Sequence, residues 1–278
     1  MKTTPLRFGG PLARPANRAP KGSALRLATW GWCGALAGGL LALILFAPAR
    51  WLAHVVHEST GQRIVLAEPR GTLWQGSARL LLTGGAGSQD MAALPGRVQW
   101  TLRPGLTGLH LSLLAQCCTA EALQLHATPL LGGLRLALED AQSQWPASVL
   151  AGLGTPWNTV QPSGQLRLQN RGLSAEWNTG RLQVAGSAVL EARDVSSRLS
   201  TLRPMGSYRL TLRGGPTVSL TLETLEGSLQ LTGNGQWVGS RLRFSGAARA
   251  APEREAALAN FLNIIGKRSG ARSIITLG

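Results

Sequence analysis

The sequence predicts a mainly β protein: one large antiparallel sheet domain behind a single N-terminal transmembrane helix, with a short helix near the C-terminus. Two observations carry this prediction. Residues 27–49 form one uncharged apolar run, and beyond it apolar and polar residues alternate with period two through much of the chain. The 35 glycines, together with Ser and Thr, punctuate the alternating runs. The chain is therefore expected to consist of a membrane anchor and an exported β-rich domain.

The apolar run has the length of a membrane span. It lies between Arg26 and Arg50, and at about 1.5 Å per helical residue it measures roughly 35 Å, enough to cross a hydrocarbon core of about 30 Å. Six cations and no acid precede it. The positive-inside bias therefore predicts a basic cytoplasmic arm over residues 1–26, an anchor over 27–49 and an exported domain over 50–278.

Cleavage of this segment is the alternative. Ala47-Pro48-Ala49 has the small residues of a signal-peptide cleavage site. The apolar run, however, is longer than the roughly 7–15 residues of a signal-peptide core. Tryptophans also mark both of its ends, as in the aromatic belt of membrane helices; these are Trp30, Trp32 and Trp51. We therefore expect a retained anchor.

Strand patterns fill the exported domain. Alternation is clearest over residues 208–213, 218–223 and 241–244, and glycine-containing turns separate these runs. Gly239-Ser240 has the Gly-X form of a type II′ hairpin turn. One apolar face per strand predicts an antiparallel sheet whose other face is wet or meets a partner. Further runs of this kind are Arg79–Leu82, Leu109–Leu113, Leu123–His126, Leu134–Leu138, Gln165–Gln169 and Arg181–Leu190.

One clear helix is expected near the C-terminus, over Glu253–Gly266. Pro252 precedes it, Gly266 closes it, and a terminal strand follows at Ile274–Leu277. Its apolar residues share one face of a helix with 3.6 residues per turn; they are Leu258, Phe261, Leu262 and Ile265.

Two sequence fragments recur within the domain. Trp74–Gly84 resembles Trp237–Gly246, and Thr101–Pro104 reappears as Thr201–Pro204. The order of the fragments is reversed in the second half, so they are not a tandem duplication. We interpret the domain as two β-rich halves in one continuous unit, which meet near Trp145–Pro162.

The same fragments supply the candidate structural and binding residues. A tryptophan is expected to pack over a glycine-containing turn. The predicted structural residues are Trp74, Gly76, Trp100, Pro104, Pro204, Tyr208, Trp237 and Gly239. Arginines that alternate with apolar residues are expected to project from the polar face of one sheet and to attract an acidic partner or anionic headgroups. This predicted interaction surface consists of Arg209, Arg213, Arg241 and Arg243.

The charge and the cysteines exclude several classes of function. The net charge is +15, but the arginines are scattered singly along an exported domain, so we do not expect nucleic-acid binding. Of the three cysteines, Cys33 lies in the anchor, and Cys117 and Cys118 are adjacent. Neighbouring cysteines rarely bond each other, because the ring so formed is strained. We therefore expect no disulfide and interpret the adjacent pair as two small buried residues at a strand end.

The sequence contains no catalytic constellation. His54 and His57 have helical spacing, but they lack the HExxH order and a nearby third ligand. Cys117-Cys118 lacks the C-x-x-C spacing of redox proteins, and Glu139-Asp140 is interpreted as a polar turn that ends a strand. No nucleophile-elbow or phosphate-loop motif occurs in a suitable context. We predict no catalytic residue, no metal site, no cofactor and no enzymatic activity.

Five motifs in a fixed order behind the anchor resemble those of the general secretion pathway protein N family, the N component of bacterial type II secretion systems. They are Gly71–Ser77, Val98–Pro104, Leu202–Tyr208, Gly233–Gly239 and Leu262–Gly266. The resemblance extends over about residues 26–278. It implies a single-pass inner-membrane protein with a periplasmic β-rich domain and no enzymatic activity, which assists export of folded proteins across the outer membrane. The implied partners are platform proteins, pseudopilins or the periplasmic domains of the outer-membrane channel, together with membrane lipid.

Two modes of binding stay open at this point. A sheet edge can accept a strand from a partner protein through main-chain hydrogen bonds. The alternative function is lipid handling, because strands with one apolar face can also form a periplasmic groove for lipid. A continuous leucine-lined concave face would favour lipid handling, and a sealed core would favour a scaffold.

Overall fold

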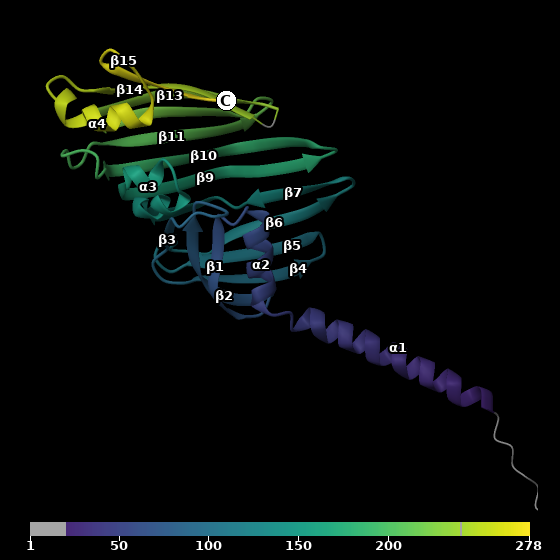
Figure 1. Ribbon diagram of the computed structural model, residues 1–278. Coiled ribbons are helices and arrows are strands. Elements are labelled where there is room, and N and C mark those ends of the chain that lie inside the picture. The colour runs from purple at the N-terminus through teal and green to yellow at the C-terminus, as the bar shows by residue number, and fades with distance from the viewer. Residues whose placement is uncertain (1–20, 240) are drawn as a thin grey trace, which may run out of the picture. The chain divides into compact units, whose positions relative to one another are not determined.

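The computed structural model describes residues 21–239 and 241–278, except for the side chains of residues 21–31 and 33 (Figure 1). It divides into two units, Met1–Leu45 and Phe46–Gly278. The predicted cytoplasmic arm, residues 1–26, falls mostly outside the described residues. Each unit is described here by itself.

The first unit contains helix α1 (Lys21–Leu45), on which most of the predicted anchor falls. Several anchor side chains, those of residues 27–31 and 33, are outside the described set. Within the described part of the chain, no helix combines the length and the apolar character needed to cross a membrane. The anchor over residues 27–49 therefore stays a prediction.

The second unit is one antiparallel sheet of 16 strands, which confirms the predicted mainly β fold. The sheet order is β1-β2-β4-β5-β6-β7-β9-β10-β11-β12-β13-β14-β16-β15, with β3 beside β2 and β8 beside β9. The strands are β1 (Ile64–Gly71), β2 (Gln75–Thr83), β3 (Met91–Ala93), β4 (Val98–Gly105), β5 (Gly108–Ala115), β6 (Leu123–Leu130), β7 (Gly133–Leu138), β8 (Ala141–Pro146), β9 (Ser163–Asn178), β10 (Arg181–Ser196), β11 (Gly206–Gly215), β12 (Ser219–Gly227), β13 (Leu229–Val238), β14 (Arg241–Ala250), β15 (Lys267–Ser269) and β16 (Arg272–Leu277). Every strand run expected from the alternation lies within one of them, except that β12 begins at Ser219, one residue after the start of the predicted run 218–223.

Strand β9 joins the two halves into one sheet. Its C-terminal part pairs with β7 and its N-terminal part pairs with β8, so two short strands share one edge of a 16-residue strand. Asn170 closes the gap between them, since its side-chain amide donates to the carbonyl of Glu139 (2.9 Å). The predicted junction, Trp145–Pro162, contains the 3₁₀ helix η1 (Ala147–Leu153) and the short helix α3 (Trp157–Val160). The interpretation as two halves in one continuous unit agrees with this sheet.

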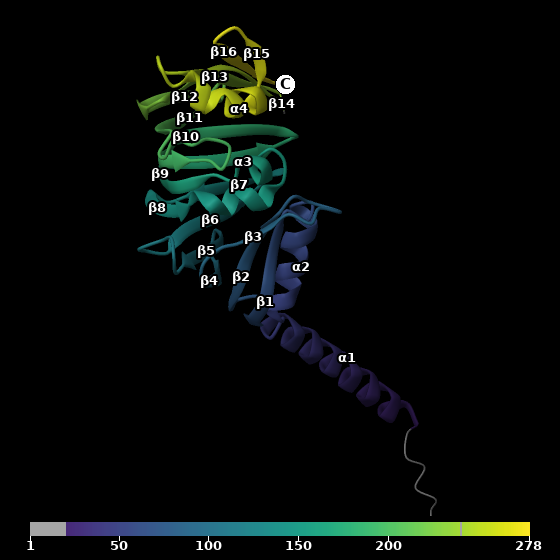
Figure 2. The same cartoon turned by 60° about the vertical axis from the view of Figure 1, so that its left-hand side comes forward.

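Helices cover one face of the sheet, as Figure 2 shows for α2 (Ala49–Ser59), α3 and α4 (Glu255–Ile265). Ala49 of α2 packs with Ala78 and Trp100, and η1 contributes Val149 to a second cluster. The buried residues of α4 are Leu258, Phe261 and Leu262. We call this side the helix-covered face and the opposite side the open face. Apolar residues on alternate strand positions provide the core because only one side chain in two points to the helices.

The helix and the strand predicted near the C-terminus are confirmed, with small differences in their bounds. The predicted helix over Glu253–Gly266 corresponds to α4, which begins after Arg254 and is followed by Gly266. The predicted terminal strand lies within β16. The recurring Thr-Leu-Arg-Pro fragment does not have a common structure: residues 101–104 lie in β4, whereas residues 201–204 lie in the connection between β10 and β11.

Candidate interaction surfaces

The four predicted arginines lie on the open face of strands β11 and β14. Directly opposite residues of an antiparallel pair share a face, and one row of such residues crosses all four strands from β11 to β14. That row consists of Arg213, Ser219, Gln236 and Arg243. Arg209 and Arg241 occupy positions of the same alternation on β11 and β14. The structure therefore brings the four arginines to one face, as the alternation predicts.

Arg209 differs from the other three because carboxylates hold it. Its guanidinium lies 2.9 Å from Glu191 and 3.1 Å from Glu223, and Glu191 also binds Arg193 at 2.6 Å. Two hydrogen bonds hold the pKa of the Glu191 carboxyl below its ordinary value: the one from Arg193 has the larger effect, and the one from Arg209 the smaller. Arg209 is thus part of a cross-strand ion-pair network and contributes little free positive charge.

The C-terminal end of the sheet carries a group of positive charges without carboxylate partners among the described residues. Residues 241–278 contain seven Lys or Arg and two acids. Across the part of the chain that the structure describes, every ion pair lies outside this segment. Arg249 lies directly opposite Arg272, and like charges in that position destabilise a sheet. We call the following set the basic edge: Arg241, Arg243, Arg249, Lys267, Arg268 and Arg272.

Sequence reasoning missed four members of the basic edge: Arg249, Lys267, Arg268 and Arg272. Arg249 continues the odd-numbered alternation of Arg241 and Arg243, which is a signal that could have identified it. The edge strand β15 has only three residues, all exposed, and it pairs with residues 272–274 of β16. A short, charged edge strand is a common protection against unwanted strand pairing, and it leaves an acidic partner as the favoured one.

Trp100 and Tyr208 are the best-packed of the predicted structural residues. Trp100 is 3% exposed, its indole nitrogen donates to the carbonyl of Leu73 (3.1 Å), and its ring lies against Gly76. The hydroxyl of buried Tyr208 donates to the carbonyl of Leu229 (3.1 Å), and burial raises the pKa of Tyr208 above its ordinary value. Both residues therefore link neighbouring parts of the sheet by a side-chain hydrogen bond as well as by packing.

The other predicted structural residues have more varied positions. Trp74 and Trp237 are only half-buried, whereas Phe244, which sequence reasoning did not single out, covers three glycines. These glycines are Gly233, Gly235 and Gly246. Pro104 lies in β4 and Pro204 in the connection before β11. Gly239 has a φ of +64°, as a hairpin turn requires, but Ser240 is outside the described residues, so the turn type stays a prediction.

The expectation that Cys117 and Cys118 stay unbonded is wrong. They form a disulfide with an S–S distance of 2.00 Å. The pair occupies a tight turn after β5, in which the Cys118 amide donates to the Ala115 carbonyl (2.9 Å) and the Thr119 hydroxyl accepts from the Ala115 amide (3.0 Å). This turn brings the two side chains together locally. Cys118 is buried beside Leu94 and Val98, but Cys117 is exposed, so only one of the two cysteines is buried as expected.

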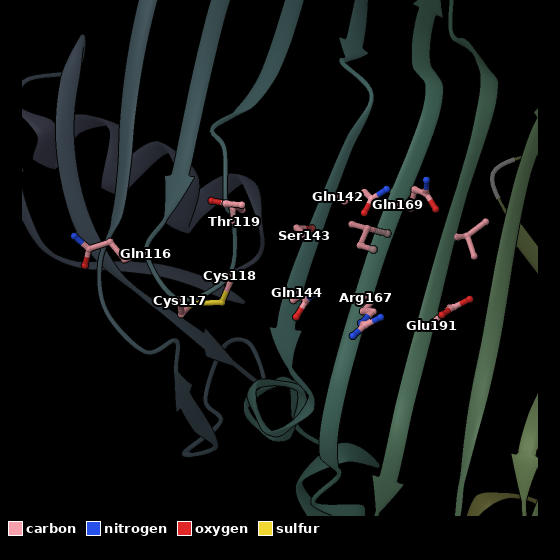
Figure 3. A pocket seen from close by; sticks show the side chains of 13 residues that line it. Gln116, Cys117, Cys118, Thr119, Gln142, Ser143, Gln144, Arg167, Gln169 and Glu191 are labelled. Atoms are coloured by element: carbon pink, nitrogen blue, oxygen red, sulfur yellow. A yellow bond between two sulfur atoms is a disulfide. The ribbon is translucent and has the colours of Figure 1, made fainter.

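The disulfide borders an open polar hollow of about 620 Å³ (Figure 3). Arg167 and Glu191 lie opposite each other on β9 and β10 and contribute the charged groups of its lining. Amide side chains make up much of the rest: Gln116, Gln142, Gln144 and Gln169. The hollow therefore offers hydrogen-bonding groups of both kinds on the open face, without a cluster of acids.

Other titratable pairs have structural positions. Asp140 accepts a hydrogen bond from the Gly172 amide (2.6 Å), and Glu139 lies 2.6 Å from His126, so the Glu139-Asp140 pair does occupy the turn that ends β7. His54 and His57 lie in α2. Among the described residues, no group of three or more His, Cys, Asp or Glu could hold a metal ion.

The helix-covered face contains an apolar cavity of about 390 Å³. Leu150 of η1, Trp157 of α3 and Phe261 of α4 line one side of it, and strands β9 to β14 and β16 line the other. Burial decreases along the cavity, from Leu229, which is fully buried, to Leu277, which is 56% exposed. The cavity is therefore closed at the α4 end and open toward the hairpin ends of the strands. It is the leucine-lined feature that lipid handling would need.

Comparison with known proteins agrees with the order of the motifs. A family model described as type II secretion system (T2SS), protein N, matches residues 62–275, which is more than half of the 278-residue chain. Neither the curated proteins nor the solved structures gave a match. The matched range includes all of the predicted structural residues and all six residues of the basic edge. The resemblance to general secretion pathway protein N is thereby confirmed, and the chain belongs to the type II secretion system protein N family.

Proposed function

We propose that the protein is an accessory inner-membrane component of the type II secretion system, which assists export of folded proteins across the outer membrane by binding other proteins. Membership of the protein N family supports a role in this envelope machinery. The observation that carries the binding role is the basic edge, where six cations lie without a carboxylate partner among the described residues.

The proposed topology follows from charge. The arm over residues 1–26 has six cations and no acid, so it is assigned to the cytoplasm, residues 27–49 to the membrane and residues 50–278 to the periplasm. A periplasm-dependent reporter enzyme fused after Gly278 is expected to be active. Activity of a cytoplasm-dependent reporter at the same site would contradict this topology.

The proposed partner surface combines a sheet edge with charge. A strand from a platform protein, a pseudopilin or the outer-membrane channel could extend the sheet beyond β15 and the uncovered part of β16. Acidic residues of that strand would then lie near the unpaired cations. Exposed charges are screened over about 8 Å at physiological ionic strength, so this binding is expected to weaken as salt is added.

Binding, and not catalysis, is the role that these groups suit. On the open face, the acids Glu191 and Glu223 are held by Arg209 in ion pairs. General acid–base chemistry needs groups that are free to accept or donate protons near a substrate. Arginines without carboxylate partners suit attraction of an acidic surface instead.

In-cell crosslinking tests this proposal. Photoreactive residues are placed at Arg213, Arg243 and Lys267, with Arg79 as the matched control because it is an exposed β-strand arginine that pairs with Glu68 (3.3 Å). Capture of platform, pseudopilin or channel components from the first three positions, and not from Arg79, is expected. Equal capture from all four positions, or capture from none, would contradict the proposed surface.

Lipid handling is the second candidate function, and the apolar cavity is the observation that favours it. The cavity lies on the helix-covered face, opposite the arginine row of the open face.

A further inference from the structure

We propose that the apolar cavity binds an acyl chain of an anionic membrane phospholipid, with the headgroup beside Arg213 and Arg241. This inference rests on the second candidate function and names its ligand, its site and the residues that hold it.

The side chains that line the cavity favour a hydrocarbon ligand. Among its side chains only Tyr208 and Trp157 carry a polar atom. The Tyr208 hydroxyl already donates to the Leu229 carbonyl. A polypeptide in the cavity would leave backbone N–H and C=O groups without partners, which is unfavourable, whereas an acyl chain has no such groups. The volume of about 390 Å³ lies within the range of about 300–1,000 Å³ that is common for small-molecule sites.

The open end of the cavity is apolar and partly exposed. Its walls near the hairpin ends are formed by half-buried leucines, Leu210, Leu220 and Leu242, and by exposed Leu277. Leucine side chains that stay in water cost free energy, and an acyl chain that covers them removes this cost. The open end is therefore the part of the cavity that gains most from a ligand.

An exposed apolar row extends this face beyond the cavity. Leu134 lies directly opposite Trp177, and Trp177 lies opposite Leu182, across β7, β9 and β10. Their exposed fractions are 42%, 58% and 54%. By register this row shares the face of Leu111 and its core neighbours. Contiguous exposed apolar side chains can mark interaction sites, and this row offers further apolar contact for a second acyl chain.

Charge at the open end favours an anionic headgroup. Arg213 follows Leu212 near the hairpin end of β11, and Arg241 precedes Leu242 at the hairpin end of β14. Both arginines belong to the open face, so a headgroup at the mouth of the cavity meets them around the ends of these strands. Neither is in an ion pair with a carboxylate side chain of the described residues. Arginine is the side chain best suited to bind phosphate through two parallel hydrogen bonds.

The test uses the full-length chain in phosphatidylcholine vesicles that contain a small fraction of phosphatidylglycerol with a photoreactive group on one acyl chain. After illumination, mass spectrometry locates the labelled peptides. Labelling of strands β10 to β14 is expected. Labelling confined to residues 21–59 would show only contact with the membrane and would overturn the proposal.

Leu220→Trp fills the cavity and stays apolar. Excluding about two methylenes already weakens acyl-chain binding by about tenfold, so labelling of β10 to β14 is expected to fall at least that far. Leu131→Trp is the matched control, because Leu131 is fully exposed at a hairpin tip. A cooperative thermal transition checks that Leu220→Trp folds, and Leu242→Trp replaces it if it does not. Unchanged labelling in a folded cavity-filling variant would overturn the proposed site.

The headgroup is tested separately with Arg213→Gln/Arg241→Gln. The wild-type chain is expected to label several-fold more with phosphatidylglycerol than with a phosphatidylcholine probe of the same acyl chain, and the double variant is expected to lose this preference. A retained preference would overturn the headgroup assignment. These assays contain no secretion component, and Arg243 and Lys267 are not headgroup residues. Failure of the lipid assays therefore leaves crosslinking from Arg243 and Lys267 unaffected, and failure of that crosslinking leaves the lipid assays unaffected.

Discussion

Gly233→Ala is expected to force Phe244 out of its position on the sheet. A Cβ atom at residue 233 would lie 2.4 Å from Phe244 Cζ, against about 3.5–4.0 Å for favourable carbon contacts, so the ring must move by about 1 Å. Overpacking of this kind costs about 1–3 kcal/mol. The lower entropy of alanine in the unfolded chain returns about 0.4–1 kcal/mol. Gly233→Ala alone should therefore destabilise by about 0–2.5 kcal/mol, too wide a range for a decisive test by itself.

A double-mutant cycle with Phe244→Ala isolates the contact. The entropic contribution of alanine at 233 is the same with and without the Phe244 ring, so it cancels, and the double variant should be more stable than the sum of single effects by about 1–2 kcal/mol. Urea unfolding of the full-length chain in mild detergent measures each free energy. Asn234→Ala, next in sequence but exposed on the open face, is the control and should add to Phe244→Ala within about 0.5 kcal/mol. An interaction energy below that value for Gly233 would refute the packing argument.

Two further predictions concern burial and pH. Trp100→Ala should lower the free energy of unfolding by about 3–5 kcal/mol, because the buried ring and its hydrogen bond to Leu73 are lost. Trp237→Ala should lower it by less, because Trp237 is half-buried. Equal shifts of the urea midpoint for the two variants would contradict this prediction. Because Arg193 and Arg209 lower the folded-state pKa of Glu191, the unfolded chain binds the proton first. The resulting stabilisation is present above the ordinary value of 4.5 and is lost as the pH falls through the lower folded value. Glu191→Gln should flatten this acid dependence, and an unchanged slope in denaturation at several pH values would disprove it.

Strand positions could be predicted because the signal is local. Side chains at alternate positions, such as Leu210 and Leu212 in β11, show directly which face of a strand is buried. The double pairing of β9 could not be predicted in this way. It depends on a contact of Asn170 with the carbonyl of Glu139, 31 residues away in sequence, and on the lengths of β7 and β8.

The errors of sequence reasoning have a common cause. The Cys117–Cys118 bond depends on a turn that the Thr119 hydroxyl closes, and Phe244 covers three glycines from two strands. Neither arrangement leaves a periodic pattern. A tryptophan does pack over a glycine, as expected, but the indole on Gly76 belongs to Trp100 of the neighbouring strand and not to Trp74.

The sequence by itself determined the antiparallel sheet, the C-terminal helix and the family, because alternation, helical periodicity and motif order are properties of the chain alone. Only the tertiary structure decided which charges are free and which apolar surface is open. Arg209 and Arg243 look alike in sequence, but Glu191 and Glu223 neutralise only Arg209. Leu229 and Leu277 are both apolar strand residues, but only Leu229 is buried. The physical reason is that charge pairing and burial depend on neighbours that the fold brings together across strands and helices.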